Sequence, residues 1–325
     1  MSSSSATASA FSSAPTPLSS SSSSATLSSP APTPTTYEPP AKRVLIAGCG
    51  DLGMRVARLL LQRNQSDQVW GLRRNPPADD THLAFDARFT WLAADLAVPG
   101  ALKDDLPKAL THLIFAAAPD ARTEADYRAV YRSGLERVVQ AVASPSLQRV
   151  MFVSSTAVYG DHGDAWIDEN TVVAPKGFNG RVLVETEQWL QDQAEHFDAL
   201  SLRLSGIYGP GRNYLLERLR LGQASAPAGR AHWVNRIHIE DAAAALVYLL
   251  ELPKPQQTYL VTDSTPLPMR TLYEDLAKLV GGPVPPVGAA PASVGSKRLS
   301  NARLRETGFA LKWPDSRLGH AALLA

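Results

Sequence analysis

Residues 48–53 read Gly48-Cys49-Gly50-Asp51-Leu52-Gly53, which is a G-x-G-x-x-G pattern. The apolar run 43–47 comes before it, and helical periodicity over residues 51–63 follows it. A strand, a glycine turn and a helix in this order form the context that a dinucleotide-binding site requires. The glycines allow a tight turn, the approach of a pyrophosphate to the backbone, and close packing of the helix on the strand. We therefore expect a nucleotide site formed by Gly48, Gly50, Asp51, Leu52 and Gly53, with a purely structural turn as the alternative.

The length and composition are those of a globular protein. The chain has 325 residues, of which 44% are hydrophobic and 19% are charged, so it can bury a substantial core in one or two domains. Its 32 basic and 31 acidic residues give a net charge of +1, which provides no electrostatic argument for binding nucleic acid or an anionic membrane. No apolar run approaches the roughly 18 residues that a membrane-spanning helix needs. We expect a small-molecule substrate, with neither nucleic acid nor membrane as a partner.

The first 41 residues differ from the rest of the chain. They consist almost wholly of Ser, Ala, Thr and Pro, so they have little apolar surface to bury, and we predict a disordered tail ahead of one domain over residues 42–325. The tail lacks the basic start and apolar stretch of a secretory signal, and it lacks the arginines of a plastid transit peptide. The single cysteine, Cys49, excludes an internal disulfide and is typical of a reducing compartment. We favour a cytoplasmic protein, with import into a plastid or another organelle as the alternative.

From residue 43 onward, runs with strand character alternate with helical patterns. We expect strands over residues 43–48, 68–72, 89–93, 112–116 and 149–154, and helices over residues 51–63 and 124–143. This alternation predicts a parallel sheet with helices on both faces. Ligands of such folds bind at the carboxyl ends of the strands.

The end of the second expected strand bears on the choice of cofactor. An acidic residue about 20 positions after the glycine turn would bind the ribose 2′-hydroxyl of NAD. This region instead contains Arg73 and Arg74 with no carboxylate. Two guanidinium groups suit the 2′-phosphate of NADP, because their planar donors match phosphate oxygens. We predict NADP as the cofactor, with NAD less favoured and a solvated charged turn as the alternative.

Two other strand ends are expected at the same edge of the sheet. Asp95 and Leu96 follow the third strand, where Asp95 could accept a hydrogen bond from an adenine amino group or cap a helix. Ala116, Ala117 and Ala118 end the fourth strand, where small side chains let a cofactor lie close to the backbone. Small residues also serve to pack helices on sheets, so the alanines alone do not define a site.

Three later segments resemble motifs of one superfamily. Residues 154–160, SSTAVYG, resemble a Ser-Ser-x-x-Val-Tyr-Gly motif, and residues 202–211, LRLSGIYGPG, resemble a Leu-Arg-x-x-x-Val-Tyr-Gly-Pro-Gly motif. Residues 237–241, IHIED, resemble an Ile-His-Val-x-Asp segment. With the glycine turn, these segments make the chain from about residue 42 to its end resemble the extended short-chain dehydrogenase/reductase superfamily, in its NAD-dependent epimerase/dehydratase group.

The resemblance implies both a fold and a catalytic residue. The expected fold is an α/β Rossmann-like doubly wound parallel sheet with a smaller C-terminal substrate lobe, whose segments lie mainly after residue 205. Ser155 aligns with the catalytic hydroxyl of the family, although a serine at a strand end can also bond only to backbone. A homodimer through the long helices is a further expectation from the family.

The chain departs from the family at the residues that transfer the proton. In the family a Tyr-x-x-x-Lys pair acts there, the lysine lowering the pKa of the tyrosine. The matching positions here are Asn179 and Leu183, which cannot perform this role. Tyr159 or Tyr208 replaces the missing tyrosine, or catalysis has been lost. A third explanation, a misplaced register, is disfavoured because the chain contains no Tyr-x-x-x-Lys match. Arg181, at the start of the same expected helix, would lower the pKa of a nearby phenol or bind an anionic substrate.

Arginines in the C-terminal part are candidates for substrate binding. Arg212 follows the Gly-Pro-Gly loop, and Arg236 precedes the histidine segment. Together with Arg218 they would bind a phosphorylated or carboxylated substrate, although surface arginines are the common alternative. The seven histidines do not pair with carboxylates at the spacing of a metal site, so we predict no metal.

The sequence therefore supports two functions. The first is an NADP-dependent oxidoreductase or epimerase/dehydratase-like enzyme acting on a small polar substrate such as a nucleotide sugar, with Ser155 orienting the substrate oxygen and Tyr159 carrying the proton. The second is a non-catalytic NADP(H)-binding protein that regulates or binds a partner.

Overall fold

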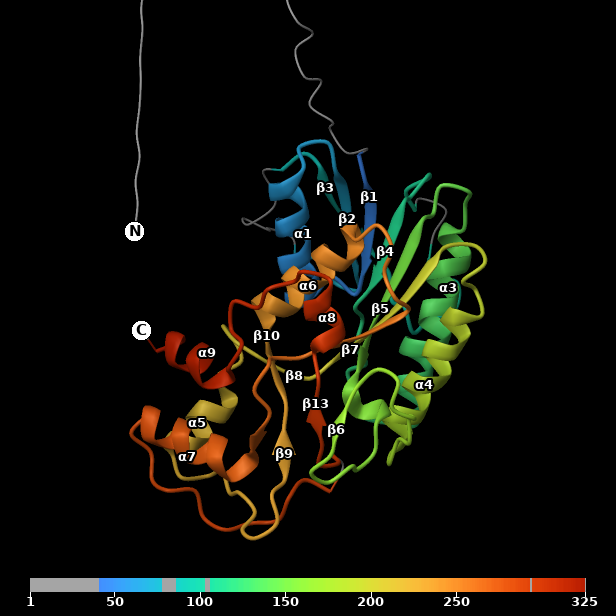
Figure 1. Cartoon of the computed structure of the whole chain (residues 1–325). Helices are drawn as coiled ribbons and strands as arrows, with labels where there is room; N and C mark the ends of the chain where they lie inside the picture. Colours follow the sequence, from blue (N-terminus) through green and yellow to red (C-terminus); the bar gives the residue numbers. More distant parts are fainter. Residues whose placement is uncertain (1–40, 78–85, 103–105, 293, 325) are drawn as a thin grey trace, which may run out of the picture. The chain divides into compact units, whose positions relative to one another are not determined.

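The structure is a computed structural model that describes residues 41–77, 86–102, 106–292 and 294–324. The predicted tail over residues 1–41 lies outside this part of the chain, apart from Ala41. A seven-stranded sheet with the order β11-β7-β5-β4-β1-β2-β3 forms the centre of the fold, and all its pairings are parallel (Figure 1). Its strands are β1 Arg43–Ala47, β2 Gln68–Arg73, β3 Phe89–Ala93, β4 His112–Phe115, β5 Arg149–Ser155, β7 Asp198–Leu204 and β11 Thr258–Val261.

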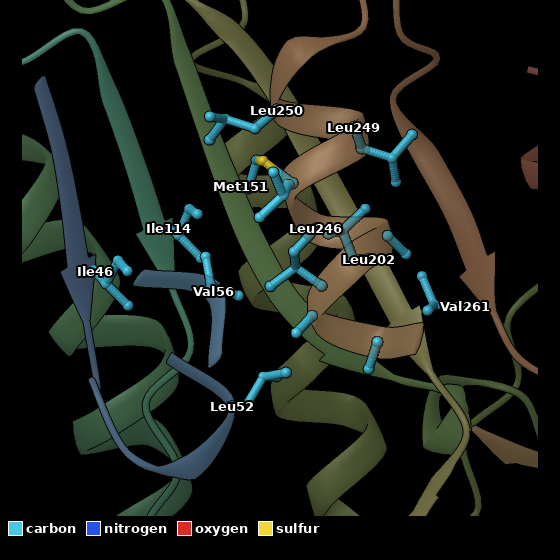
Figure 2. Packing of buried hydrophobic residues seen from close by; sticks show 14 of the residues in the cluster. Ile46, Leu52, Val56, Ile114, Met151, Leu202, Leu246, Leu249, Leu250 and Val261 are labelled. Atoms are coloured by element: carbon cyan, nitrogen blue, oxygen red, sulfur yellow. The ribbon is translucent and has the colours of Figure 1, made fainter. Parts of the chain in front are cut away.

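Helices cover both faces of this sheet. Strands of a two-sided sheet are nearly continuous in apolar residues, as in β4, where all four residues are buried. Helices α1 Asp51–Arg63 and α6 Ile239–Glu251 pack on one face, and α3 Ser133–Val142 and α4 Phe178–Gln191 pack on the other. Figure 2 shows the first face, where Leu250 of α6 lies beside Met151 of β5, and Leu246 of α6 lies near Leu202 of β7. The predicted Rossmann-like α/β fold is confirmed.

The helix expected over residues 124–143 is interrupted. It consists of α2 Glu124–Tyr127, a π-helical turn Arg128–Arg132, and α3. The Ser133 amide donates to the Arg128 carbonyl five residues earlier, which defines the π turn. An extra residue is thereby inserted in the helix within the span Arg128–Arg132, which contains Tyr131.

Three short strand pairs and four helices form most of the C-terminal part. Strands β8 Gly206–Tyr208 and β10 Arg236–His238 pair in parallel, as do β6 Trp166–Ile167 and β13 Arg298–Leu299, whereas β9 Trp233–Val234 and β12 Leu267–Pro268 pair antiparallel. The helices are α5 Tyr214–Arg220, α7 Met269–Leu279, α8 Ala302–Glu306 and α9 Ser316–Ala322. Leu216 and Leu219 of α5 pack with Leu272 and Leu276 of α7 in a separate small core.

Candidate functional site

A cavity of about 640 Å³ lies at the carboxyl ends of the parallel strands. This volume is within the range of about 300–1,000 Å³ that is usual for small-molecule sites. Many of the residues predicted to form a site line it: Gly48, Gly50, Asp51, Leu52, Arg73, Arg74, Asp95, Leu96, Ala116, Ala117, Ala118, Ser155 and Arg212. Among the described residues, the cavity lining does not include Gly53, Tyr159, Arg181 or Arg236.

The glycine turn joins β1 to α1 at the floor of the cavity. Gly48 has a φ of +86°, and a Cβ at this position would lie 2.2 Å from the Ala117 nitrogen, so only glycine fits. At Gly50 a Cβ would meet nothing within 4 Å, so the backbone there faces open space. At Gly53 a Cβ would lie 3.0 Å from Cγ2 of Ile46, because α1 packs closely on β1. This arrangement leaves room for a phosphate group beside the first N–H groups of α1.

The two arginines after β2 lie at one side of the cavity. Arg74 Nη2 is 2.5 Å from Oδ2 of Asp120, a residue of the loop after β4. The hydrogen bond from Arg74 to Asp120 raises the pKa of the guanidinium above its usual value, so Arg74 stays charged. Both side chains are exposed, and both line the cavity. Arg73 lines the same wall.

The ends of β3 and β4 complete this wall. Oδ1 of Asp95 accepts a hydrogen bond from the Ala97 amide at 2.9 Å, so its carboxylate caps the turn that contains Leu96. Ala116 continues the parallel pairing by donating its amide to the Ala47 carbonyl at 2.8 Å. The small side chains of residues 116–118 thus leave the backbone accessible from the cavity.

Ser154 and Ser155 end β5 at the cavity, and their side chains have different partners. Oγ of Ser155 accepts a hydrogen bond from the Ala157 amide at 3.2 Å, which caps the short 3₁₀ turn Thr156–Val158. Oγ of Ser154 donates to Oε1 of the buried Glu187 at 2.5 Å. The Ser155 hydroxyl therefore keeps its own proton available to a ligand, whereas that of Ser154 is committed to the carboxylate.

Tyr159 lies in a buried polar network behind these serines. Its hydroxyl donates to the Asp168 carbonyl at 2.9 Å and accepts from Nη1 of Arg203 at 2.6 Å, and 2% of the residue is exposed. Arg203 also binds Glu187, with Nη2 2.7 Å from Oε2. Burial raises the pKa of Tyr159 to about 12, although the nearby Arg203 charge opposes the shift. The hydroxyl thus has two protein partners and does not reach the cavity.

The segment that should contain the proton-transfer pair lies on α4. Leu183 is buried in the hydrophobic core, and Asn179 lies in the first turn beside Gly177. Neither residue lines the cavity. Arg181 is half exposed, with Nη2 3.8 Å from a carboxylate oxygen of Glu124. It has no phenol among its described partners.

Of the other predicted residues in the C-terminal part, Arg212 lines the cavity, whereas Arg236 and Tyr208 do not. Nη2 of Arg212 is 3.3 Å from a carboxylate oxygen of Asp51, so this pair joins the loop after β8 to the start of α1 beside the cavity. Arg236 lies deeper, next to Gly206, and burial lowers its pKa despite the nearby Tyr273 and Asp263. Tyr208 stacks on His320 with ring centroids 4.1 Å apart, and burial raises its pKa.

Tyr131 is a cavity residue that the sequence did not indicate. It lies on the π turn, lines the cavity and is partly buried. Its ring contacts Tyr127, with centroids 5.3 Å apart, and Phe152 of β5, with centroids 5.9 Å apart. The only sequence signal for Tyr131 is its position on the helix that follows residues 116–118. Tyr127 lies on the same helix, so this signal does not distinguish the two tyrosines.

The described residues contain neither a metal centre nor a membrane-spanning helix. No group of three or more His, Cys, Asp or Glu side chains is arranged to hold a metal ion within residues 41–324, gaps excepted. In the same part of the chain, no helix has both the length and the apolar character needed to cross a membrane.

Known proteins resemble this chain along most of its length. The family model "NAD dependent epimerase/dehydratase family" matches residues 44–261. Protein YeeZ of Escherichia coli (strain K12) is 30% identical over 278 residues, which cover 84% of this chain and 97% of that protein. A solved structure from Methylobacillus flagellatus, provisionally described as an NAD-dependent epimerase/dehydratase, is 36% identical with a TM-score of 0.72, and the match covers 88% of this chain and 98% of the other.

An enzyme with a stated substrate is also similar. The 2′-dehydrokanamycin reductase of Streptomyces kanamyceticus is 30% identical over 219 residues, which cover 62% of this chain and 60% of that protein.

Proposed function

The chain belongs to the NAD-dependent epimerase/dehydratase family, and we propose that it is an NADP-dependent oxidoreductase that acts on a carbonyl or hydroxyl group of a small polar compound. The proposal rests above all on the cavity, which brings the glycine turn, two arginines and Ser155 to the same sheet edge. The similar 2′-dehydrokanamycin reductase supports a carbonyl substrate, and a nucleotide sugar is a second candidate.

The glycine turn fits the pyrophosphate of a dinucleotide. Gly50 faces open space, and the 13-residue helix α1 begins beside it with Asp51 and without a side-chain cap at Gly50. The amides of this first turn would bind the phosphate oxygens. Asp95 would bind the adenine, and the alanines of residues 116–118 would contact the nicotinamide ribose. When bound, the nicotinamide supplies or accepts the hydride.

The arginines after β2 support NADP over NAD. A 2′-phosphate at this wall would meet Arg73 and Arg74, whose side chains line it. Asp120 is the only residue with which Arg74 forms an ion pair among the described residues, and a phosphate would compete with it. A neutral 2′-hydroxyl would gain much less from two cations.

Ser155 would orient the substrate. Its Oγ lies at the cavity with a proton free to donate to a substrate oxygen. Arg212 would bind an anionic or hydroxylated part of the substrate near the start of α1. The roles predicted for Arg181, Arg236 and Tyr159 stay predictions, as do the substrate lobe after residue 205, the homodimer and the cytoplasmic location.

The proposal is tested by binding and turnover together. Purified protein is titrated with NADPH and with NADH, and is then assayed with each cofactor against aldehydes, ketones and nucleotide sugars. We expect tighter binding of NADPH and turnover of a carbonyl compound that Ser155→Ala reduces. Binding of NADPH without turnover of any compound would support the regulatory alternative, and turnover that survives Ser155→Ala would refute the assigned site.

A further inference from the structure

The proposed reaction needs a proton donor. None of the residues that the sequence suggested for this role presents a proton to the cavity. Asn179 and Leu183 have no usable proton and lie outside the cavity lining. The Tyr159 hydroxyl is bonded to Asp168 and Arg203. The Tyr208 hydroxyl is fully buried and belongs to a residue that does not line the cavity.

Tyr131 is the one tyrosine of the described residues that lines the cavity. Its hydroxyl has no hydrogen-bond partner among residues described in the structure, unlike that of Tyr159. Val153, Ser154 and Ser155 line the same cavity, and the Tyr131 ring packs edge-on against Phe152 of the same strand. Tyr131 and Ser155 therefore line the same cavity.

The π turn explains how Tyr131 comes to this position. A π turn is less stable than a regular α-helical turn and is frequent at functional sites. Here it is supported from outside the helix: a Cβ at Gly134 would lie 3.1 Å from the Leu96 carbonyl, so the helix lies close against the loop after β3. Nη2 of Arg137 donates to the Ala129 carbonyl at 3.0 Å and also to that of Leu96. These contacts fix the backbone on both sides of the Tyr131 position.

We propose that Tyr131 donates the proton to the substrate oxygen, in place of the tyrosine that α4 lacks. This inference rests on the proposed function. Reduced nicotinamide, when bound, would supply the hydride that the substrate's carbonyl carbon takes up as the C=O π bond breaks. The O–H bond of Tyr131 breaks, the new hydroxyl of the product forms, and the phenolate regains a proton from the solvent in the cavity.

The surroundings of Tyr131 suit a donor more than a base. Burial, together with the neighbouring Tyr127, raises the pKa of its hydroxyl above the usual value of a phenol, so the group holds a proton to donate at neutral pH. Even so, the phenol remains a stronger acid than an alcohol, so transfer to a developing alkoxide is favourable. Packing against Tyr127 and Phe152 holds the ring, which limits the loss of conformational freedom on reaction.

Kinetics of paired variants test this role. Tyr131→Phe removes the hydroxyl and keeps the ring, and Tyr127→Phe makes the same change one turn away, outside the cavity lining. The assay uses NADPH and the carbonyl compound that wild type turns over fastest. For Tyr131→Phe we expect kcat to fall by about 100-fold or more, as for loss of a general acid, while KM for NADPH stays within about threefold. Tyr127→Phe should keep wild-type kcat.

A second measurement does not depend on turnover. 3-Fluorotyrosine is placed at position 131, or at position 159 as a control, and its ¹⁹F resonance is followed while NADPH is added. We expect NADPH to shift the resonance at position 131 and to leave that at position 159 nearly unchanged.

The outcomes separate this inference from the proposed function. A wild type that binds no NADPH, or that turns over no carbonyl compound, would overturn the proposed function and the proton role with it. If wild type is active but Tyr131→Phe keeps kcat, or if NADPH leaves the resonance at position 131 unmoved, Tyr131 is not the donor although the proposed function stands.

Discussion

The ion pair between Arg74 and Asp120 lies at the edge of the cavity. Arg74 follows β2 and Asp120 lies beyond the end of β4, and these strands flank β1, so the pair lies across the sheet edge where the glycine turn begins. A 2′-phosphate bound by Arg74 must either displace the Asp120 carboxylate or bind beside it and be repelled by its negative charge. Asp120 is thus expected to weaken the binding of the very cofactor that the arginines favour.

Asp120→Asn should therefore tighten the binding of NADPH. Exposed ion pairs are weak, so we expect a Kd lower by about two- to fivefold at low salt, with little change for NADH. Fluorescence titration with both cofactors measures the effect. Asp126→Asn is the matched control, because Asp126 also lines the cavity but its carboxylate accepts a hydrogen bond from the hydroxyl of Thr123, the N-cap of α2. An equal gain in the control, or an equal gain for NADH, would contradict the competition.

His112 makes stability depend on pH. Burial, together with the charges of Arg149 and Lys42, lowers its pKa from 6.5 to about 4. The unfolded chain therefore binds a proton between about pH 6.5 and pH 4 that the folded chain does not, and the free energy of unfolding falls as the pH falls through this window. His112→Gln should lose this part of the slope. Urea unfolding of both proteins at several pH values compares them, and parallel slopes would show that His112 does not contribute.

At the scale of elements, α6 packs with α1 on one face of the sheet. Leu246 of α6 is fully buried against the sheet. Helix α1, which begins at the glycine turn, packs on the same face of the sheet (Figure 2). Leu246→Ala should lower the free energy of unfolding by about 2–5 kcal/mol, because it leaves a cavity in this packing. Leu318→Ala, at a residue 58% exposed on α9, should change stability by less than about 0.5 kcal/mol. Urea unfolding measures both, and similar losses would contradict the assigned core.

Regular elements were predictable because local pattern determines them. The helix over residues 51–63 and the strand over residues 89–93 have the expected bounds, since each has a clear apolar period next to turn residues. The π turn was not predictable, because residues 128–132 are compatible with an α-helix and the turn depends on contacts of Gly134 and Arg137 with the loop after β3. Short pairs such as β8 with β10 are too brief to show a period.

At the scale of the molecule, the sheet topology explains which site residues the sequence could locate. Residues directly after parallel strands meet at one edge, so the glycine turn, Arg73, Asp95 and Ser155 were predicted together and line one cavity. Their contact with a cofactor stays a prediction. Side-chain direction was not predictable, because it depends on tertiary partners. Tyr159 turns to Arg203, and Tyr131 reaches the cavity from a helix.

The cofactor site is central to the proposed function, and one titration tests it directly. The binding of NADPH and NADH is measured for wild type and for the double variant Arg73→Asp, Arg74→Asp. We predict that wild type binds NADPH more tightly than NADH, and that the double variant loses affinity for NADPH much more than for NADH. Equal loss for both cofactors, or a wild type that prefers NADH, would contradict the account.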